Sequence, residues 1–124
     1  MNRVINCELI INRVIDRKEE NSVIKGKGYY KKEDNQIVVF FLSDEIKYKY
    51  IYSEGDLTIL CNDSKYKFRE NVKEEGQIKN GDYIFKITTL ASKIEVNANY
   101  IIVNYSLFQN NNLIGTYNSK LSFN

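Results

Sequence analysis

Hydrophobic and polar residues alternate with a period of two along most of this 124-residue chain. Successive side chains of a β-strand point to opposite faces, so this pattern is typical of strands with one buried face. No segment shows a convincing helical period of 3.6 residues. The pattern therefore predicts an all-β protein.

The first half of the chain contains six expected strands. In the first, one face carries Ile5, Cys7, Leu9 and Ile11, and we expect residues 19–22 to turn the chain. The third strand is apolar on both faces, which indicates a central position. The six expected strands span residues 5–11, 23–31, 36–42, 45–53, 57–61 and 65–69.

The second half begins with a stretch in which the alternation fails. Residues 70–79 are therefore expected to form a surface loop or a short edge strand. Asn80-Gly81 is a strong turn signal. Four further strands are expected at residues 83–89, 93–96, 99–109 and 113–123, which makes about ten strands joined by short turns.

Short connections between consecutive strands indicate an antiparallel up-and-down meander. A flat sheet of this length would expose two long edges, and the chain contains no proline to interrupt them. Closure into a β-barrel removes the edges, so we expect one barrel domain spanning residues 1–124. A sandwich is the alternative fold, which the short connections disfavour. The interior of such a barrel is either filled by side chains or wide enough for one small ligand.

Several segments resemble the YwiB-like family of small uncharacterised proteins from low-GC Gram-positive bacteria. Residues 101–107 (Ile-x-Val-x-Tyr-x-Leu), followed by a turn and Leu-Ile-Gly at 113–115, are similar to the closing hairpin of that family. Gly-Tyr-Tyr at 28–30, Phe68 and the Gly-led strand at 81–89 match further family positions. Two positions depart from the family pattern. After the fifth strand, Asn62-Asp63-Ser64 stands where the family tends to have an Arg-x-Gly turn. The family also has an acidic residue near the end of the third strand, for which only Ser43, Asp44 or Glu45 is a counterpart here. The resemblance implies a calycin-type barrel related in fold to lipocalins, and no established activity.

Charge, apolar runs and cysteine spacing bear on the partners and the cellular location of the protein. The net charge of +2 gives no strong case for nucleic acid or an anionic membrane surface. Polar residues interrupt the N-terminal segment, and the longest apolar run, residues 37–42, is far shorter than a membrane-spanning helix. We therefore expect a cytoplasmic protein. Cys7 and Cys61 lack the spacing of a zinc or dithiol site and are expected to be buried, reduced thiols.

Candidate catalytic chemistry is sparse. The chain has no histidine, which removes the usual general base and the commonest metal ligand. Carboxylates occur in pairs at Asp44-Glu45, Glu54 with Asp56, and Glu74-Glu75, where we expect turns or loops and solvated side chains. Gly26-x-Gly28 lies inside a strand and not in a phosphate-binding loop. The sequence predicts a protein that is not an enzyme and uses no cofactor or metal.

Two binding hypotheses follow, together with a third that the sequence cannot rank. In the first, inward residues line a pocket for a small apolar or amphipathic molecule, with ordinary core packing as the alternative; these residues are Gly26, Gly28, Tyr30, Tyr48, Tyr50 and Phe85. In the second, single-stranded nucleic acid binds an outer face with exposed tyrosines and the basic residues Lys25, Lys27, Lys47, Lys49, Lys65, Lys67 and Arg69. The third hypothesis is binding of a partner protein to an uncovered strand edge.

Overall fold

The computed structural model describes residues 2–124 and contains ten β-strands in this part of the chain. The strands are β1 (Asn2–Ile15), β2 (Lys18–Glu33), β3 (Gln36–Ser43), β4 (Ile46–Ser53), β5 (Asp56–Cys61), β6 (Ser64–Phe68), β7 (Lys73–Asn80), β8 (Tyr83–Val96), β9 (Tyr100–Gln109) and β10 (Asn112–Phe123). The described residues include no helix long and apolar enough to cross a membrane.

Each strand pairs antiparallel with the next, and β10 pairs with β1 to close the barrel. The closing register places Cys7 opposite Phe123 and Val14 opposite Thr116. The predicted all-β antiparallel meander closed into a barrel is therefore confirmed. A closed barrel has no central strand, so the apolar outer face of β3 reflects packing such as that of Phe40 on Tyr29, whose ring centroids lie 5.3 Å apart.

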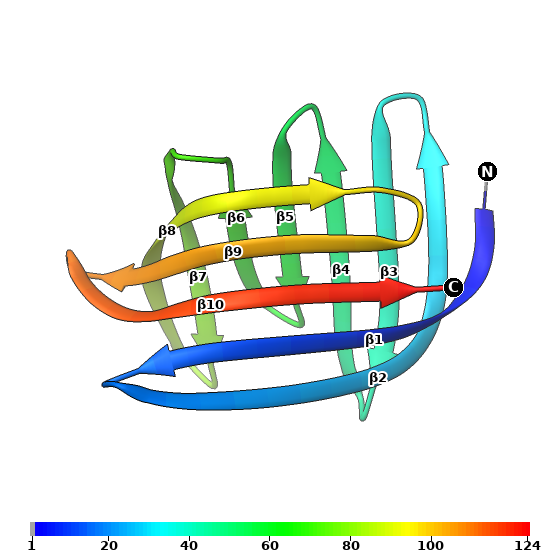
Figure 1. The fold of residues 1–124 in the computed structure, drawn as a ribbon. Helices are drawn as coiled ribbons and strands as arrows, with labels where there is room; N and C mark the ends of the chain where they lie inside the picture. Colours follow the sequence, from blue (N-terminus) through cyan, green and yellow to red (C-terminus); the bar gives the residue numbers. More distant parts are fainter. Residues whose placement is uncertain (1) are drawn as a thin grey trace.

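The barrel is flattened into two layers that share β2 and β8. In Figure 1, β9, β10 and β1 run across the strands β3 to β7 behind them. The part of β2 from Lys27 to Glu33 pairs with β3, whereas Lys18–Gly26 pairs only with β1. Likewise the first half of β8 pairs with β7, and the half from Thr88 onward pairs with β9. Closure therefore leaves some strand segments paired on one side only, contrary to the expectation that it removes all edges; among the described residues these include Lys18–Gly26 of β2 and Tyr83–Ile87 of β8.

Two glycines allow β2 to pass from one layer to the other. A Cβ atom on Gly28 would lie 1.7 Å from the carbonyl oxygen of Phe40, and one on Gly26 would lie 2.3 Å from that of Leu42. Both contacts are with the backbone of β3, which cannot move aside as a flexible side chain could. These glycines thus serve the close approach of a neighbouring strand, a common reason for glycine within a strand.

Residues 73–80 form a strand, so of the two alternatives expected for residues 70–79, a surface loop or a short edge strand, the structure contains a strand. Burial does alternate along β7, but the half-buried positions hold Glu74, Gly76 and Ile78, of which only one is a large apolar residue. A Cβ on Gly76 would meet the carbonyl oxygen of Lys65 at 2.4 Å, so β6 also approaches closely here. The alternation of hydrophobic and polar residues does not reveal this strand, because close approach of the β6 backbone, and not burial of large apolar side chains, determines its position.

The seam between β6 and β7 is short, with one register pair, Lys65 to Gln77. The fully buried side chain of Thr89 on β8 reaches across this seam, and its hydroxyl donates a hydrogen bond to the carbonyl of Lys67. A side chain thus satisfies a backbone acceptor that the sparse β6–β7 ladder leaves available.

Tight two-residue turns connect most strands. Both residues have positive φ at Asp16-Arg17, Asp44-Glu45 and Asn110-Asn111, as type I′ hairpin turns require. The first of these turns lies before residues 19–22, which belong to β2, so the turn expected there is wrong. Residues 83–89 and 93–96 also form one strand, β8, with a register irregularity between Ala91 and Lys93.

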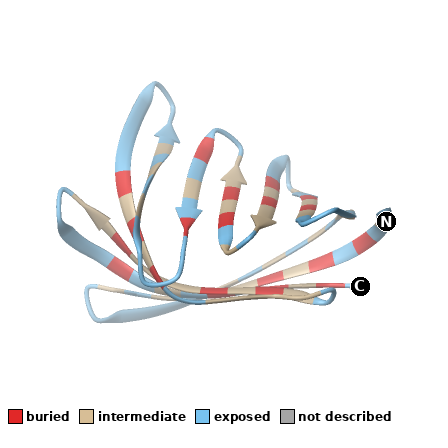
Figure 2. Cartoon of the chain, turned by 90° about the horizontal axis from the view of Figure 1, so that it is seen from above, coloured by how far each residue is buried: buried red, intermediate tan, exposed pale blue. Residues whose placement is uncertain are grey.

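The turns divide the barrel into two ends. The hairpin end is formed by the turns at residues 16–17, 44–45, 62–63, 81–82 and 110–111, which lie along the left and lower sides of Figure 1. The terminal end lies opposite, where the two chain ends lie. Figure 2 shows buried positions as bands on neighbouring strands of both layers. The fully buried side chains of the core include Ile5, Tyr30, Val39, Phe41, Leu57, Phe68, Ile101, Val103 and Leu121.

Replacement of Gly28 by alanine tests the close approach of β2 and β3. The new Cβ would overlap backbone atoms of Phe40, so we expect Gly28→Ala to lower the free energy of unfolding by about 3 kcal/mol or more, the upper range for overpacking. Gly81→Ala is the matched control, because Gly81 has nothing within 4 Å of its Cβ position and only a positive φ of 63°. That backbone conformation costs about 1 to 2 kcal/mol for a residue with a Cβ. Urea denaturation that shows equal losses for both variants would contradict the proposed contact.

Candidate ligand cavity

A cavity of about 220 Å³ lies between the two layers, toward the hairpin end. Its walls come from the inward faces of strands in both layers. They combine aliphatic groups with hydroxyl, thiol and guanidinium groups; the lining residues are Leu9, Ile11, Arg13, Ile24, Tyr48, Tyr50, Ile59, Cys61, Tyr66, Phe68, Tyr105, Tyr117 and Ser119. The wall can therefore contact both apolar and hydrogen-bonding parts of a small molecule.

Five tyrosines dominate this wall. Tyr105 and Tyr117 are stacked with ring centroids 4.9 Å apart, and Phe68 packs against Tyr105 at 4.6 Å. On the other layer, Phe41 stacks on Tyr48 at 4.6 Å. Such ring pairs hold the side chains in defined positions beyond the effect of burial alone. The cavity is bounded by ordered aromatic rings.

Burial raises the pKa of the tyrosines in the cavity wall. Desolvation raises the pKa of Tyr50 and of Tyr105 well above the ordinary value, while a hydrogen bond with Ser119 partly offsets the effect at Tyr50. Desolvation also raises the pKa of Tyr66 and of Tyr117, and the positive charge of Arg13 opposes the rise at Tyr117 and Tyr105. The hydroxyls therefore remain neutral hydrogen-bonding groups at physiological pH.

The two cysteines are free. Cys7 is buried, as expected, and desolvation raises the pKa of its thiol to about 11. Cys61 is only half-buried, because its side chain borders the cavity beside Tyr48, with which it forms a hydrogen bond. Burial raises the pKa of this thiol as well. Neither group has the lowered pKa of a nucleophilic cysteine.

Arg13 is the one charged residue in the cavity wall. It lies on the same face of β1 as Leu9 and Ile11 and donates a hydrogen bond to the hydroxyl of Ser22 on β2. Its Nε atom is buried and has no hydrogen-bond partner. The sequence analysis missed Arg13, although its position in the odd-numbered series of β1 assigns it to the inward face.

Of the six residues predicted to line a pocket, Tyr48 and Tyr50 border the cavity. Tyr30 is 2% exposed and packs in the core, where its ring lies 5.6 Å from that of Phe123 and beneath the guanidinium of Arg3. Phe85 is 40% exposed on the part of β8 that β9 does not cover. Gly26 and Gly28 lie against the β3 backbone and leave no free space. The structure thus brings two of the six together.

The cavity tyrosines that the prediction missed are Tyr66, Tyr105 and Tyr117. Each occupies an alternating position within an expected strand, so the period of two already assigned a face to all three. The missing information was which end of the barrel each strand position reaches, and this depends on the register between strands.

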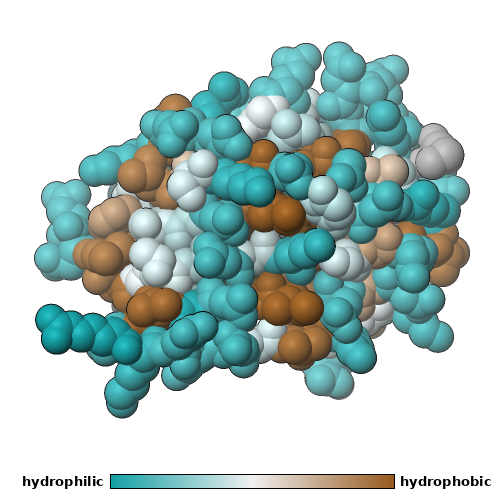
Figure 3. Space-filling model, in the orientation of Figure 1, coloured by the Kyte–Doolittle hydropathy of each residue, from teal (hydrophilic) through white to brown (hydrophobic). Residues whose placement is uncertain are grey.

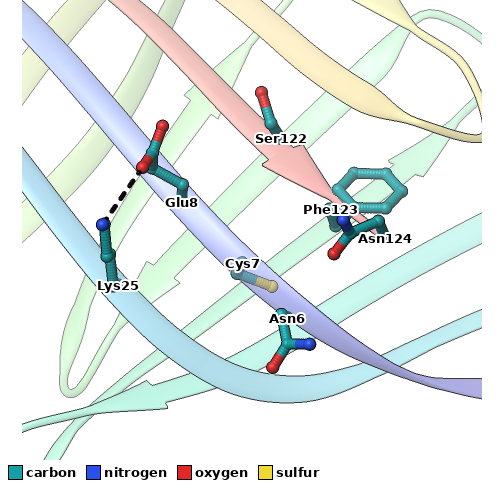
Figure 4. A pocket seen from close by; sticks show the side chains of 7 residues that line it. All are labelled: Asn6, Cys7, Glu8, Lys25, Ser122, Phe123 and Asn124. Atoms are coloured by element: carbon teal, nitrogen blue, oxygen red, sulfur yellow. Dashed lines mark ion pairs between the residues drawn. The ribbon is translucent and has the colours of Figure 1, made fainter.

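The outside of the barrel also carries hollows, of which two lie along β2. One borders the unpaired part of β2 and is lined by Val23, Gly26, Leu42, Ile46 and other residues. The other, shown in Figure 4, is lined by Asn6, Glu8, Lys25, Ser122 and Asn124, with Cys7 and Phe123 behind the strands on the interior side. Lys25 and Glu8 form an ion pair of 3.7 Å across this hollow. Both hollows are open to solvent.

The basic residues expected to bind nucleic acid are spread over β2, β4, β6 and the residue that follows β6. Two of them already pair with acids, Lys25 with Glu8 and Arg69 with Asp56 at 2.8 Å. Figure 3 shows hydrophobic side chains in separate groups among hydrophilic ones on the face formed by β9, β10, β1 and β2. Binding of single-stranded nucleic acid stays a prediction without a structural feature that favours it.

Two of the acidic pairs, Asp44-Glu45 and Glu54 with Asp56, lie at turns as expected, whereas Glu74 and Glu75 lie within a strand and not in a loop. Asp44 and Glu45 form a turn, and the hydrogen bond from Arg69 lowers the pKa of Asp56. Glu74 and Glu75 are successive residues of β7 and point to opposite faces. Within residues 2–124, no group of three or more Cys, Asp or Glu side chains is arranged to hold a metal ion.

A pH titration of tyrosine absorbance tests the buried state of the cavity wall. Because burial raises the pKa of Tyr50 and Tyr105, we expect both to stay neutral at a pH at which the tyrosines of the unfolded chain ionise, near the ordinary value of 10.0. The unfolded chain ionises first, so the free energy of unfolding should fall as the pH rises above about 10. If all ten tyrosines of the folded protein ionised together near that pH, the cavity wall would be solvated.

Comparison with known proteins bears on the fold. No family model matches the chain, and no match was found among curated proteins. Among solved structures, the crystal structure of the ywiB protein from Bacillus subtilis matches with a TM-score of 0.81 and 11% sequence identity. The match covers 98% of this chain and 91% of that protein. The expected YwiB-like fold is confirmed, and at this identity the likeness concerns the fold alone.

Proposed function

We propose that this protein binds a small apolar or amphipathic molecule in the cavity between the two layers of its barrel. The observation that carries the proposal is the uneven filling of the interior. Core side chains such as Tyr30, Leu57 and Ile101 are at most 2% exposed, whereas the wall toward the hairpin end encloses about 220 Å³.

The size of the cavity limits the ligand. An engineered protein cavity of about 150 Å³ is large enough to bind benzene. The cavity here, at about 220 Å³, is somewhat larger and below the range of drug-sized sites, which begins at about 300 Å³. A single ring, or a short chain with one polar group, fits this space.

Apolar residues near the hairpin end support entry of such a molecule from that side. Large hydrophobic residues are exposed on strand segments next to these turns; they include Val14, Val23, Leu42, Ile46, Tyr83, Ile84, Phe85 and Leu113. At the terminal end the exposed examples include Val4, at 86%, and Tyr29. Among the residues near the hairpin end, Tyr83 and Phe85 lie on the same face of β8 as the buried Ile87, so they face the interior side of that strand.

The proposal describes a binding protein and not an enzyme, since the cavity offers neutral hydroxyls and thiols with raised pKa values. It keeps the calycin-type assignment, related to lipocalins, on the strength of the closed antiparallel meander. It also keeps the cytoplasm as the location, which two free thiols fit.

A cavity-filling substitution tests the proposal. Ile59 is 9% exposed and borders the cavity, so Ile59→Phe should occupy ligand space. We expect the wild type to bind neutral benzyl alcohol, measured by chemical-shift changes in NMR spectra, and the variant to bind it at least about tenfold more weakly. Because the added atoms enter free space, the free energy of unfolding should change by less than about 1 kcal/mol.

Val4→Phe is the matched control, because it introduces the same ring at an exposed position of the terminal end. Native mass spectrometry of the purified wild type would detect a ligand that remains bound. If Ile59→Phe lost about 3 kcal/mol of stability and the wild type bound no benzyl alcohol, the interior would be a filled core and the proposal would fail.

Binding of a partner protein is the second candidate function. The observation that favours it is the pair of unpaired edges, Lys18–Gly26 of β2 and Tyr83–Ile87 of β8. Extended segments of other proteins can add to such an edge through backbone hydrogen bonds.

A further inference from the structure

We propose that the cavity ligand carries an anionic head group, and that Arg13 binds it. The ligand class is a small carboxylate with a planar apolar body, such as an aromatic acid. This inference rests on the proposed ligand-binding function and adds the charge and shape of the molecule.

The first argument is the position of Arg13. An arginine on an exterior face would be solvated at little cost, but this one lies on the inward face of β1 and borders the cavity. It is opposite Tyr117 in the β1–β10 register and borders the same cavity as Tyr105. Partial burial of a positive charge is unfavourable unless a negative group or several acceptors compensate it.

The second argument is that the protein itself supplies little compensation. The ion pairs of the described residues do not include Arg13. Within residues 2–124, its one hydrogen-bond acceptor is the neutral hydroxyl of Ser22, and its Nε has no partner. Glu20 is the residue opposite Arg13 in the β1–β2 register, yet its side chain is exposed and forms no ion pair with Arg13.

Arg3 provides an internal comparison. It lies on the same face of β1 near the terminal end, and its Nε is also buried without a partner. Its guanidinium, however, stacks over the ring of Tyr30 at 4.6 Å and donates a hydrogen bond to the carbonyl of Ala98. Arg3 thus closes the packed end of the barrel against protein groups, whereas Arg13 borders empty space.

The third argument is chemical fit. A guanidinium presents several N–H donors in a plane and matches the two oxygens of a carboxylate. The stacked rings of Tyr105 and Tyr117 and the aliphatic wall of Leu9, Ile11 and Ile24 suit a flat apolar body. A volume of about 220 Å³ leaves space for a carboxylate beside one benzene-sized ring.

Benzoate and its neutral analogue benzamide test the charge requirement, with affinities measured by NMR titration at low and at high salt. We expect the wild type to bind benzoate more tightly than benzamide. Arg13→Gln should lower the affinity for benzoate by roughly 10- to 100-fold, the effect of losing a charge-assisted hydrogen bond, and leave the affinity for benzamide nearly unchanged. Arg13→Lys, which keeps the charge but loses the planar fork, should retain part of the preference.

Arg17→Gln is the matched control, since Arg17 is exposed in the adjacent turn and its replacement removes the same charge. We expect it to leave both affinities unchanged. Thermal melts of each variant ensure that folded protein is compared.

The outcomes separate the two proposals. If benzamide and benzoate bound the wild type equally, or if Arg13→Gln and Arg17→Gln had the same effect on benzoate, the anion assignment would be overturned while the binding cavity stood. If neither probe bound and benzyl alcohol did not bind either, the proposed function itself would fail.

Discussion

The backbone of β3 lies against Gly26 and Gly28 of β2, and the closure of the barrel depends on this contact. The carbonyl oxygens of Leu42 and Phe40 lie 2.3 and 1.7 Å from the positions that Cβ atoms would take on these glycines. Strand β2 can therefore pair with β1 along its length and turn to pair with β3 over its second half. Strand β8 makes the corresponding passage on the other side of the barrel. Two strands shared between layers let ten strands close as a flattened barrel.

This arrangement explains why the interior is filled unevenly. Large side chains such as Tyr30, Phe41 and Ile101 meet in the core. Toward the hairpin end, β2 is no longer paired with β3, and the layers enclose the cavity bordered by five tyrosines and Arg13. Apolar packing in one half gives stability, whereas the other half retains polar groups whose burial is only partly compensated. Polar groups kept in this way are the basis of the proposed binding site.

Much of the fold could be predicted from the sequence because alternation reports which side of a strand is buried. It identified the inward series of β1 and β4 and the turns at Glu54-Gly55 and Asn80-Gly81. It failed at β7, where Glu74 and Gly76 occupy inward positions for reasons of backbone approach. It also divided β8 into two expected strands, and it left residues 70–79 open between a surface loop and a short edge strand.

The cavity was less predictable because it depends on register and bending. The aromatic residues chosen from the sequence share an inward direction, but Tyr30 lies in the core, Tyr48 borders the cavity and Phe85 is partly exposed. Alternation predicts on which face of the strand a side chain lies, but not whether it lies near the hairpin end or the terminal end of the barrel. The inward glycines were open to two interpretations, free space or close approach, and only the position of the β3 backbone distinguishes them.

Residue-resolved amide hydrogen exchange along β2 tests the central claim most directly. If β2 passes between layers at its glycines, alternate amides of Lys18–Gly26 face no partner strand and should exchange rapidly, while the residues Lys27–Lys31 are paired on both sides and their amides should exchange slowly. Uniform slow exchange over the whole of Lys18–Lys31 would contradict the account, because it would mean that both edges of β2 are paired throughout.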